Sequence, residues 1–376
     1  MHVKLREKPI GPEMFEIIFA AALSLYFIQL IIFIIGVRRK FGKLSEPELP
    51  AVTVIVAARN EEGNILGCIE SLDKAIYPEK KIEIIIVNDH SADSTGTIIE
   101  KFIAGKPKFK TIIPDEPVGR LGGKTNALAS AVRIARGEII LTTDADCIVS
   151  TTWVKTLASY FKSDVGFVGG FTTQAGTDLF SGMQAADFIY LLTVASGTIN
   201  LGVPLSCIGN NMAYRKSVYN EVGGYEGLTF SVTEDSRLLT AIHDLKKYKI
   251  IYPLDEEALV ISKPCPDWKT LFWQKKRWGV GGKESAPVGY FVMALGCISH
   301  AAILLTPFFF SATALYLCIF KFCADFFFIQ PVYKKLKLKL RLTNFLAFEL
   351  YFIIYVIALP FIILPNSTVK WKGRTF

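Results

Sequence analysis

Several features that would assign a chain to a common class are missing from this sequence of 376 residues. It shows no internal repeat and no low-complexity tract, and its seven cysteines are scattered, without a Cys-x-x-Cys pair or a Cys/His cluster. The cysteine pattern predicts reduced thiols and excludes a disulfide framework and a structural zinc site. A Walker A loop is excluded too, because the first glycine of that pattern is missing at the required distance before Gly123-Lys124.

Apolar residues, in contrast, are more abundant than a soluble enzyme of this size normally carries. They make up 51% of the chain, the mean hydropathy is +0.37 and the formal charge is +8. The basic residues gather at 38–40 and 334–341, beside apolar runs. Membrane-flanking cations explain this placement best, and a nucleic-acid surface is the weaker interpretation. We therefore expect an integral membrane protein with one globular domain and no nucleic-acid partner.

Hydropathy divides the chain into three parts. Residues 14–37 contain a charge-free stretch long enough to cross a bilayer, and the cations at 38–40 would hold the next part in the cytoplasm, with the plasma membrane as the expected location. Residues 50–285 form the predicted cytoplasmic domain, and 289–364 a membrane region of three predicted helices. Two of these helices should turn near Thr306-Pro307, and the third would leave the basic tail outside. Lys321 and Asp325 can pair within one span, whereas Glu349 should face protein or substrate.

Between residues 50 and 170, short β-branched runs alternate with helical stretches. Strands are expected at 52–58, 82–87, 109–113, 138–142 and 165–169, with helices at 60–73, from near 93, at 124–136 and at 151–161. Such alternation predicts an α/β fold with a mixed, mostly parallel sheet covered on both faces.

The strand at 138–142 runs into two carboxylates, Asp144 and Asp146, which are one residue apart. Strands of an α/β sheet end at the binding crevice, so both side chains would arrive where a ligand lies. Two hard oxygen ligands suit Mg²⁺ or Mn²⁺ bridging a diphosphate. A solvated turn is the alternative interpretation of an isolated Asp-x-Asp.

Other polar residues follow the earlier strands. Asn60-Glu61 follows the first strand and Asp89 the second, where it could equally cap a helix. Gly122-Gly123-Lys124 begins a helix, so its N–H groups and ammonium could meet a phosphate, although such a lysine is often merely solvated. These positions favour nucleotide binding.

The second half of the predicted domain has three further features. Residues 178–200 predict a long apolar helix, buried or at the membrane surface and not a span, and 209–215 predict loop and turn. Thr233-Glu234-Asp235 starts an amphipathic helix, where acids are also ordinary capping residues. Gln274, Arg277 and Trp278 share one face of a helix that could alternatively lie on lipid head groups.

In order, Asp89, Asp144-Ala-Asp146, Thr233-Glu234-Asp235 and Gln274-x-x-Arg277-Trp278 resemble the successive motifs of the membrane-bound family-two inverting glycosyltransferases. Cellulose, chitin and hyaluronan synthases and ceramide glucosyltransferases belong to that family. The resemblance covers about residues 50–282 and implies a Rossmann-like domain that binds a nucleotide sugar. Histidine stands at position 90, where the family usually has glycine.

The resemblance also implies a role for each matching residue. Asp89 would contact the nucleotide base, Asn60-Glu61 would form the acidic turn after the first strand, and Lys124 would lie near the nucleotide. Asp144 and Asp146 would hold the metal and diphosphate, with Asp146 the more direct metal ligand. Asp235 would be the general base, and Gln274, Arg277 and Trp278 would border the acceptor and the diphosphate.

Our functional hypothesis is therefore metal-assisted transfer of a sugar, with inversion, from a UDP-linked or similar donor. The acceptor would be a lipid or a membrane-proximal saccharide hydroxyl, since four spans are few for a polymer channel. A processive polysaccharide synthase is the alternative within this class. A nucleotide-binding transporter or scaffold is the alternative from another class, but transporters usually have repeated, broken spans.

Overall fold

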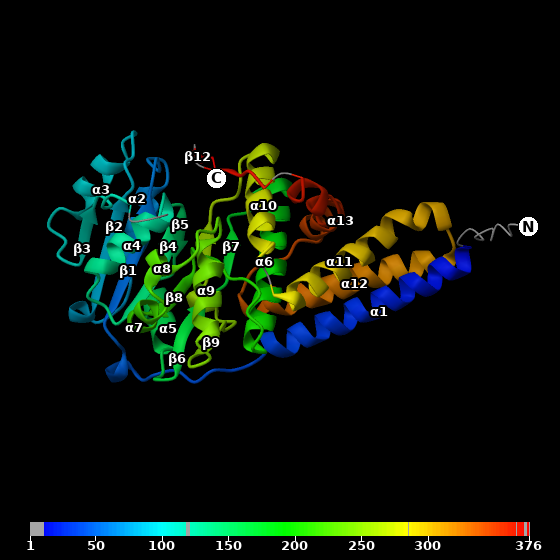
Figure 1. The fold of residues 1–376 in the computed structure, drawn as a ribbon, viewed down its shortest axis with the longest axis horizontal. Helices are drawn as coiled ribbons and strands as arrows, with labels where there is room; N and C mark the ends of the chain where they lie inside the picture. The colour runs from blue at the N-terminus through cyan, green and yellow to red at the C-terminus, as the bar shows by residue number, and fades with distance from the viewer. Residues whose placement is uncertain (1–10, 118–120, 285, 366, 372–373, 376) are drawn as a thin grey trace, which may run out of the picture.

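The computed structural model describes residues 11–117, 121–284, 286–365, 367–371 and 374–375, so the predicted domain limit at residue 285 lies outside them. A mixed sheet forms the centre of the globular domain (Figure 1). Among the described residues its strand order is β3-β2-β1-β4-β8-β6-β9. The strands are β1 (Val52–Ala58), β2 (Ile82–Asn88), β3 (Phe109–Ile112), β4 (Ile139–Asp144), β6 (Val165–Gly169), β8 (Met212–Arg215) and β9 (Lys249–Ile251).

Most neighbours in this sheet are parallel, as the sequence predicts. β1 pairs in parallel with β2 and β4, and β6 with β9, whereas β8 is antiparallel to both β4 and β6. The loop predicted at 209–215 is wrong for its second half, which is strand β8. Met212, Ala213 and Tyr214 are buried there, but a four-residue strand without a β-branched side chain gives almost no sequence signal.

Alternating side chains of the strands build a core on each face of the sheet. Val54 and Val56 of β1 pack on one face with α2 (Ile65–Asp73), α3 (Thr95–Ile103) and α5 (Trp153–Ser159). Ile55 points to the other face, which α4 (Lys124–Ile134) and α9 (Glu234–Asp244) cover. The remaining short helices of the domain are α7 (Lys216–Glu221), α8 (Gly224–Gly227), η1 (Glu46–Glu48), η2 (Glu79–Lys81) and η3 (Glu256–Ala258).

The helix predicted from residue 60 begins later, at Ile65. Asn60 has φ 52°, in the left-handed region that a right-handed helix excludes, and residues 61–64 form a turn. A second, small sheet in the order β5-β10-β7 stands beside the main one. It is formed by β5 (Cys147–Val149), β7 (Thr172–Gln174) and β10 (Val260–Ser262).

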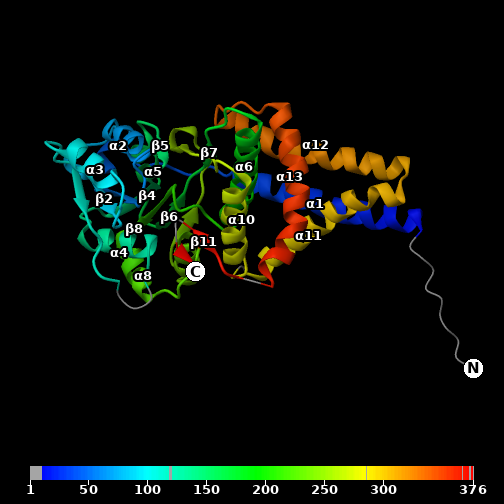
Figure 2. The same ribbon diagram turned by 90° about the horizontal axis from the view of Figure 1, so that it is seen from above.

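Five described helices are long and apolar enough to cross a membrane. They are α1 (Pro12–Val37), α6 (Leu179–Asn200), α11 (Pro287–Leu305) with η4 (Thr306–Phe309), α12 (Ala312–Lys335) and α13 (Leu342–Ile363). The predicted turn near Thr306-Pro307 is present. α1, α11 and α12 extend from the domain as a bundle, and α13 crosses that bundle at a steep angle (Figures 1 and 2).

The predicted pair of Lys321 with Asp325 forms inside this helical region, and Glu349 joins it. Lys321 Nζ lies 2.8 Å from Asp325 Oδ2 and 2.5 Å from Glu349 Oε2, and all three side chains are fully buried. Glu349 thus faces protein. One ammonium group therefore ties α12 to α13, away from lipid.

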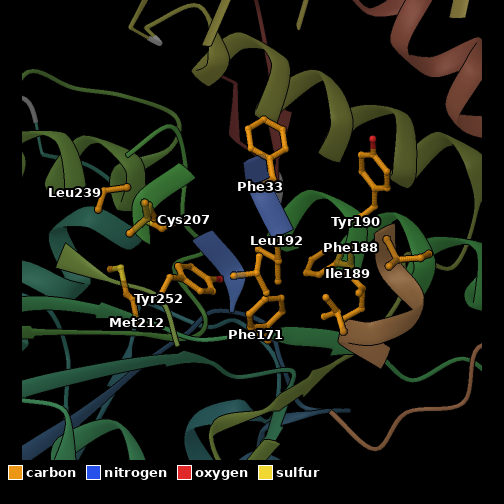
Figure 3. Close-up of a cluster of buried hydrophobic side chains, with 14 of the residues drawn as sticks. Phe33, Phe171, Phe188, Ile189, Tyr190, Leu192, Cys207, Met212, Leu239 and Tyr252 are labelled. Carbon is orange, nitrogen blue, oxygen red and sulfur yellow. The ribbon is translucent and has the colours of Figure 1, made fainter. Parts of the chain in front are cut away.

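α6 joins the globular domain to the bundle and is mostly buried, as predicted. Figure 3 shows Phe188, Leu192 and other side chains of this helix among residues from α1 and from the sheet. Gly36 of α1 and Gly197 of α6 meet so closely that a Cβ on Gly197 would lie 2.6 Å from the Phe33 carbonyl oxygen. The two glycines let the helix backbones touch.

Candidate active site

One cavity of about 1740 Å³ begins where β1, β2 and β4 end and extends between the membrane-side helices. Its wall includes α6, α11, α13 and α10 (Trp268–Gly282). Of the residues predicted to form the site, those that line this cavity are Glu61, Asp89, Lys124, Asp144, Asp146, Asp235, Gln274, Arg277 and Trp278. Asn60 does not line it. Side chains from distant parts of the chain therefore converge on one space.

The Asp144-Ala145-Asp146 turn lies between the two sheets. Asp144 is the last residue of β4, and β5 begins directly after Asp146. Ala145, between the two aspartates, is buried in the core. Both carboxylates are half-buried and face the cavity. Because each flanking strand is hydrogen-bonded into a sheet, the two carboxylates are held in place before any ligand binds.

Lys124 links this turn to the start of α9. Gly123, with φ 56°, lets the chain turn into α4 so that Lys124 begins the helix. Its Nζ lies 2.7 Å from Asp144 Oδ1 and 3.2 Å from Glu234 Oε1. Burial alone would lower the pKa of Lys124, but Asp144 and Glu234 together raise the pKa well above its ordinary value. The lysine is therefore a fixed cation at the centre of the site.

Asp235 occupies the first turn of α9, facing the cavity. Its Oδ2 accepts a hydrogen bond from Gly209 N at 2.7 Å and its Oδ1 one from Ser236 N at 2.8 Å. Burial and the neighbouring charge of Glu234 raise the pKa of Asp235 to about 6. A carboxylate with that pKa is ionised at neutral pH and is more basic than an exposed aspartate, as a general base should be.

The turn after β1 is hydrogen-bonded to the turn after β2. Asn60 Oδ1 accepts a hydrogen bond from Ala92 N at 2.9 Å, so Asn60 holds the two turns together. Asp89 is 7% exposed, and its carbonyl oxygen accepts a hydrogen bond from Arg59 at 3.1 Å. His90 has φ 54°. Glycine adopts this conformation without strain, which explains the family preference at this position.

α10 carries the last three predicted residues and is capped at its N-terminus and anchored at its middle. Asp267 caps its N-terminus by accepting from Thr270 N at 2.7 Å, and buried Lys275 forms an ion pair with buried Asp187 of α6. The Trp278 ring lies 5.3 Å from that of Phe188. Arg277 donates to the Val232 carbonyl oxygen at 3.2 Å. The helix is thereby positioned against both α6 and the segment that precedes Asp235.

Three residues of this arrangement have no role in the sequence-based prediction. Glu234 pairs with Lys124, Gly209 N–H orients Asp235, and Lys275 anchors α10. Glu234 and Lys275 lie inside the Thr233-Glu234-Asp235 and Gln274-x-x-Arg277-Trp278 motifs, so their positions in the sequence could have marked them as site residues. Gly209 gave none, because its backbone N–H reaches Asp235 only through the fold.

The carboxylates of the site fit a divalent cation that is coordinated partly by the protein and partly by a bound ligand. No group of three or more His, Cys, Asp or Glu side chains suited to a metal occurs among the described residues. The two half-buried carboxylates of the Asp144 turn could supply part of an oxygen shell, and diphosphate oxygens and water would supply the rest. Mg²⁺ is commonly bound in this way, through one or two carboxylates plus substrate phosphates.

An α/β domain joined to apolar helices, with a carboxylate-lined cavity between them, defines the class of this protein. The chain matches the family profile "Glycosyl transferase family 2" over residues 53–223 and "Glycosyl transferase family group 2" over residues 139–364, which is more than half of it. The chain belongs to glycosyl transferase family group 2.

Curated relatives agree with this assignment. A probable glycosyltransferase of Bacillus subtilis, YdaM, is 28% identical over 63% of this chain and 56% of its own length. The beta-monoglucosyldiacylglycerol synthase of Trichormus variabilis is 27% identical over 65% and 52%, and a poly-beta-1,6-N-acetyl-D-glucosamine synthase of Staphylococcus epidermidis is 26% identical over 72% and 65%. The chain thus spans little more than half the length of the first two relatives.

The fold has a solved counterpart. The mannosyltransferase PcManGT of Pyrobaculum calidifontis, in complex with GDP-Man and Mn²⁺, superposes with a TM-score of 0.61 at 19% identity. The match covers 92% of this chain and 98% of that one, so it includes the membrane-side helices as well as the sheet.

Proposed function

We propose that this protein transfers a sugar, with inversion at the anomeric carbon, from a nucleotide-diphosphate sugar to the hydroxyl group of a lipid. The single observation that supports this best is that Asp235 and the Asp144 turn share a cavity that continues between the apolar helices. Carboxylates for the donor and a base for the acceptor are thereby combined with an apolar space.

On the donor side, Asp144 and Asp146 would hold a Mg²⁺ or Mn²⁺ ion together with the diphosphate. When bound, such an ion withdraws charge from the leaving diphosphate. Lys124 and Arg277 line the same cavity and add fixed positive charge where negative charge grows. Asp89 would contact the base of the nucleotide, for which uridine is our expectation, and Glu61 would support that turn.

On the acceptor side, Asp235 would take the proton of the attacking hydroxyl group. The oxygen would form its bond to the anomeric carbon as the bond to the diphosphate breaks on the opposite face. A single displacement inverts the anomeric centre and needs no covalent intermediate with the enzyme. The Gly209 and Ser236 N–H groups hold both oxygens of Asp235, so the base is oriented before the acceptor arrives. Gln274 and Trp278 border the acceptor.

The extent of the cavity favours a lipid over a growing polymer. Among the described residues its lining includes Phe352, Tyr355 and Val356 of α13 and reaches His300 of α11, but no residue of α12 or of the outer half of α1. A channel that exports a polysaccharide would have to pass along the whole bundle. The Trichormus relative, named for a glucosyldiacylglycerol, is consistent with this preference, whereas the Staphylococcus relative represents the polymerising alternative.

Product analysis tests the proposal. Membranes containing the full chain are incubated with individual UDP- and GDP-linked sugars and Mg²⁺ or Mn²⁺, and lipid extracts are analysed by mass spectrometry. We expect one nucleotide sugar to yield a glycolipid with one added sugar, together with free nucleoside diphosphate. A long homopolymer would overturn the lipid acceptor, and the absence of nucleoside diphosphate release with every donor would favour a nucleotide-binding transporter or scaffold.

The site implies an orientation in the membrane. Nucleotide sugars are made in the cytosol, and the cations at 38–40 lie on the domain side of α1, so we propose a cytoplasmic catalytic domain and a plasma-membrane location.

A further inference from the structure

The inner end of the cavity, between the membrane-side helices, is polar. Its polar lining residues there are Tyr26 and Gln29 of α1, Tyr190 of α6 and His300 of α11. We call this part of the cavity the inner polar end. Along α11 the helix rises about 20 Å from Pro287 to His300, and along α1 about 16 Å from Val37 back to Tyr26. Polar groups at such a depth are costly and require a reason.

Two of these side chains are buried without a hydrogen-bond partner for one atom. His300 is 1% exposed and Gln29 9% exposed, and neither His300 Nε2 nor Gln29 Oε1 has a partner within the described part of the chain. His300 Nδ1 lies 2.6 Å from the Gly296 carbonyl oxygen. A carbonyl oxygen only accepts, so Nδ1 carries the proton and Nε2 of the neutral ring is an acceptor.

The tyrosines offer a third acceptor. Tyr26 donates its hydroxyl proton to Asp325 Oδ1 at 2.8 Å, and its oxygen lies 2.5 Å from the Tyr190 hydroxyl oxygen. Since the one proton of Tyr26 is used, Tyr190 must donate in that second bond. The Tyr190 oxygen therefore keeps lone pairs for another donor.

The nearby charges decide which ligand fits. Behind Tyr26, one ammonium group, Lys321, faces two carboxyl groups, Asp325 and Glu349. A phosphate or carboxylate would bring more negative charge and further acceptors to a place that already has both. A hydroxyl or amide N–H would supply the missing donor. Leaving a buried acceptor unpaired costs free energy, so a ligand that pairs with one is favoured over a ligand that does not.

We propose that the inner polar end is a binding position for a hydroxyl or amide N–H group on the apolar part of the lipid acceptor, with His300 Nε2 as the principal acceptor. This inference rests on the proposed function and adds to it a selectivity among lipid acceptors. The lipid lies along the cavity with its reactive hydroxyl at Asp235 and a second, unreactive donor group among Gln29, Tyr190 and His300. A lipid whose chain lacks such a group binds more weakly.

The test compares diacylglycerols that carry a 12-hydroxyoctadecanoyl chain with matched octadecanoyl diacylglycerols. For the wild type we expect the hydroxylated, donor-bearing lipid to be used with kcat/KM about tenfold or more above that of its plain counterpart. His300→Phe keeps the ring contacts with Tyr26 and Phe352 but removes the acceptor, and should abolish the preference. His300→Gln, which retains an acceptor, should restore part of it.

Ser299→Ala is the matched control. Ser299 precedes His300 on the same helix, is fully buried and also has an unpartnered oxygen among the described residues, but it does not line the cavity. The preference should survive in this variant. Equal use of plain and donor-bearing lipids by the wild type, or an unchanged preference in His300→Phe, would overturn the proposal. If His300→Phe does not fold, Gln29→Leu takes its place with the same expected loss.

A binding measurement separates failure of this inference from failure of the proposed function. The full-length Asp235→Asn variant is heated with each lipid in detergent, and its unfolding temperature is recorded. Greater stabilisation by the donor-bearing lipid supports the inner polar end, even if no lipid is glycosylated. Equal stabilisation by plain and donor-bearing lipids contradicts it, even if glycolipid forms.

Discussion

At the scale of single residues, the clearest feature is the raised pKa of Asp235. A general base must be unprotonated to act, so kcat/KM should fall as pH decreases through about 6, the pKa of Asp235, and should level off above it. Glu234 contributes to the raised pKa through its negative charge. The acidic limb of the pH profile should therefore move to lower pH in Glu234→Gln. A limb that stays in place in this variant would show that another group titrates.

The two left-handed residues in the turns after β1 and β2 make a contrasting pair. Asn60 and His90 have nearly the same φ, 52° and 54°, but Asn60 accepts a backbone hydrogen bond from Ala92 N at 2.9 Å, whereas the exposed His90 ring only approaches Asp89, with Nδ1 3.5 Å from Oδ1. Removing the left-handed strain should outweigh the added freedom of the unfolded chain in His90→Gly, which we expect to raise stability by about 0.5–1 kcal/mol. Asn60→Gly gains less relief, because asparagine tolerates the left-handed region, and should lower stability by up to about 1 kcal/mol through the lost hydrogen bond. Thermal unfolding of both variants checks the signs.

Single residues also show what the sequence could predict of the site. The positions of Asp144 and Asp146 at a strand end, of Asp235 at a helix start and of Arg277 on a helix face could be predicted, because each motif is a local pattern. The ion pair of Lys124 with Glu234 did not follow. It depends on how α4 and α9 pack over the same face of the sheet.

At the scale of elements, the junction between α1 and α6 should be the least tolerant of added volume. A Cβ on Gly197 would lie 2.6 Å from the Phe33 carbonyl oxygen, and a backbone atom within a helix cannot move aside. We expect Gly197→Ala to lower the unfolding temperature and to reduce recovery of folded protein. Gly296→Ala is the control, because nothing lies within 4 Å of a Cβ in that α11 position. Equal effects of the two changes would refute close helix contact as the role of Gly197.

The elements themselves were predicted unevenly. The long helices and the buried parallel strands β1, β2, β4 and β6 carry strong hydrophobic patterns and were found. The three-residue strands β5, β7, β9 and β10 have too few residues for any periodicity to develop. They form because the fold brings them beside a partner: β9 pairs with β6 of the main sheet, and β10 pairs with both β5 and β7 in the small sheet.

At the scale of the whole molecule, the structure differs from the expected outward course of α13. Just before this helix Lys337 lies 2.6 Å from Glu256 of the globular domain, and just after it Ser367 accepts from Lys283 at 2.9 Å. Both ends therefore touch the domain side, and α13 lies across the bundle (Figure 2). We predict that the C-terminal tail is on the same side of the membrane as the domain.

Cysteine labelling tests this orientation. In inside-out vesicles, a membrane-impermeant maleimide should modify Thr368→Cys, whereas sealed right-side-out vesicles should protect it. The comparison is made in a background in which Cys297 and Cys323, the cysteines that are not buried among the described residues, are replaced by serine. Labelling only from the outside would place the tail across the membrane and restore α13 as a span.

The central claim is that carboxylates from distant parts of the chain act together in one cavity, with Asp235 as the base. Nucleoside diphosphate release by Asp235→Asn, measured beside the wild type with the donor identified by product analysis, tests it most directly. The account predicts a rate about 10²–10⁴ lower, with donor binding retained, because only the proton acceptor is lost. Turnover by Asp235→Asn at the wild-type rate would contradict it.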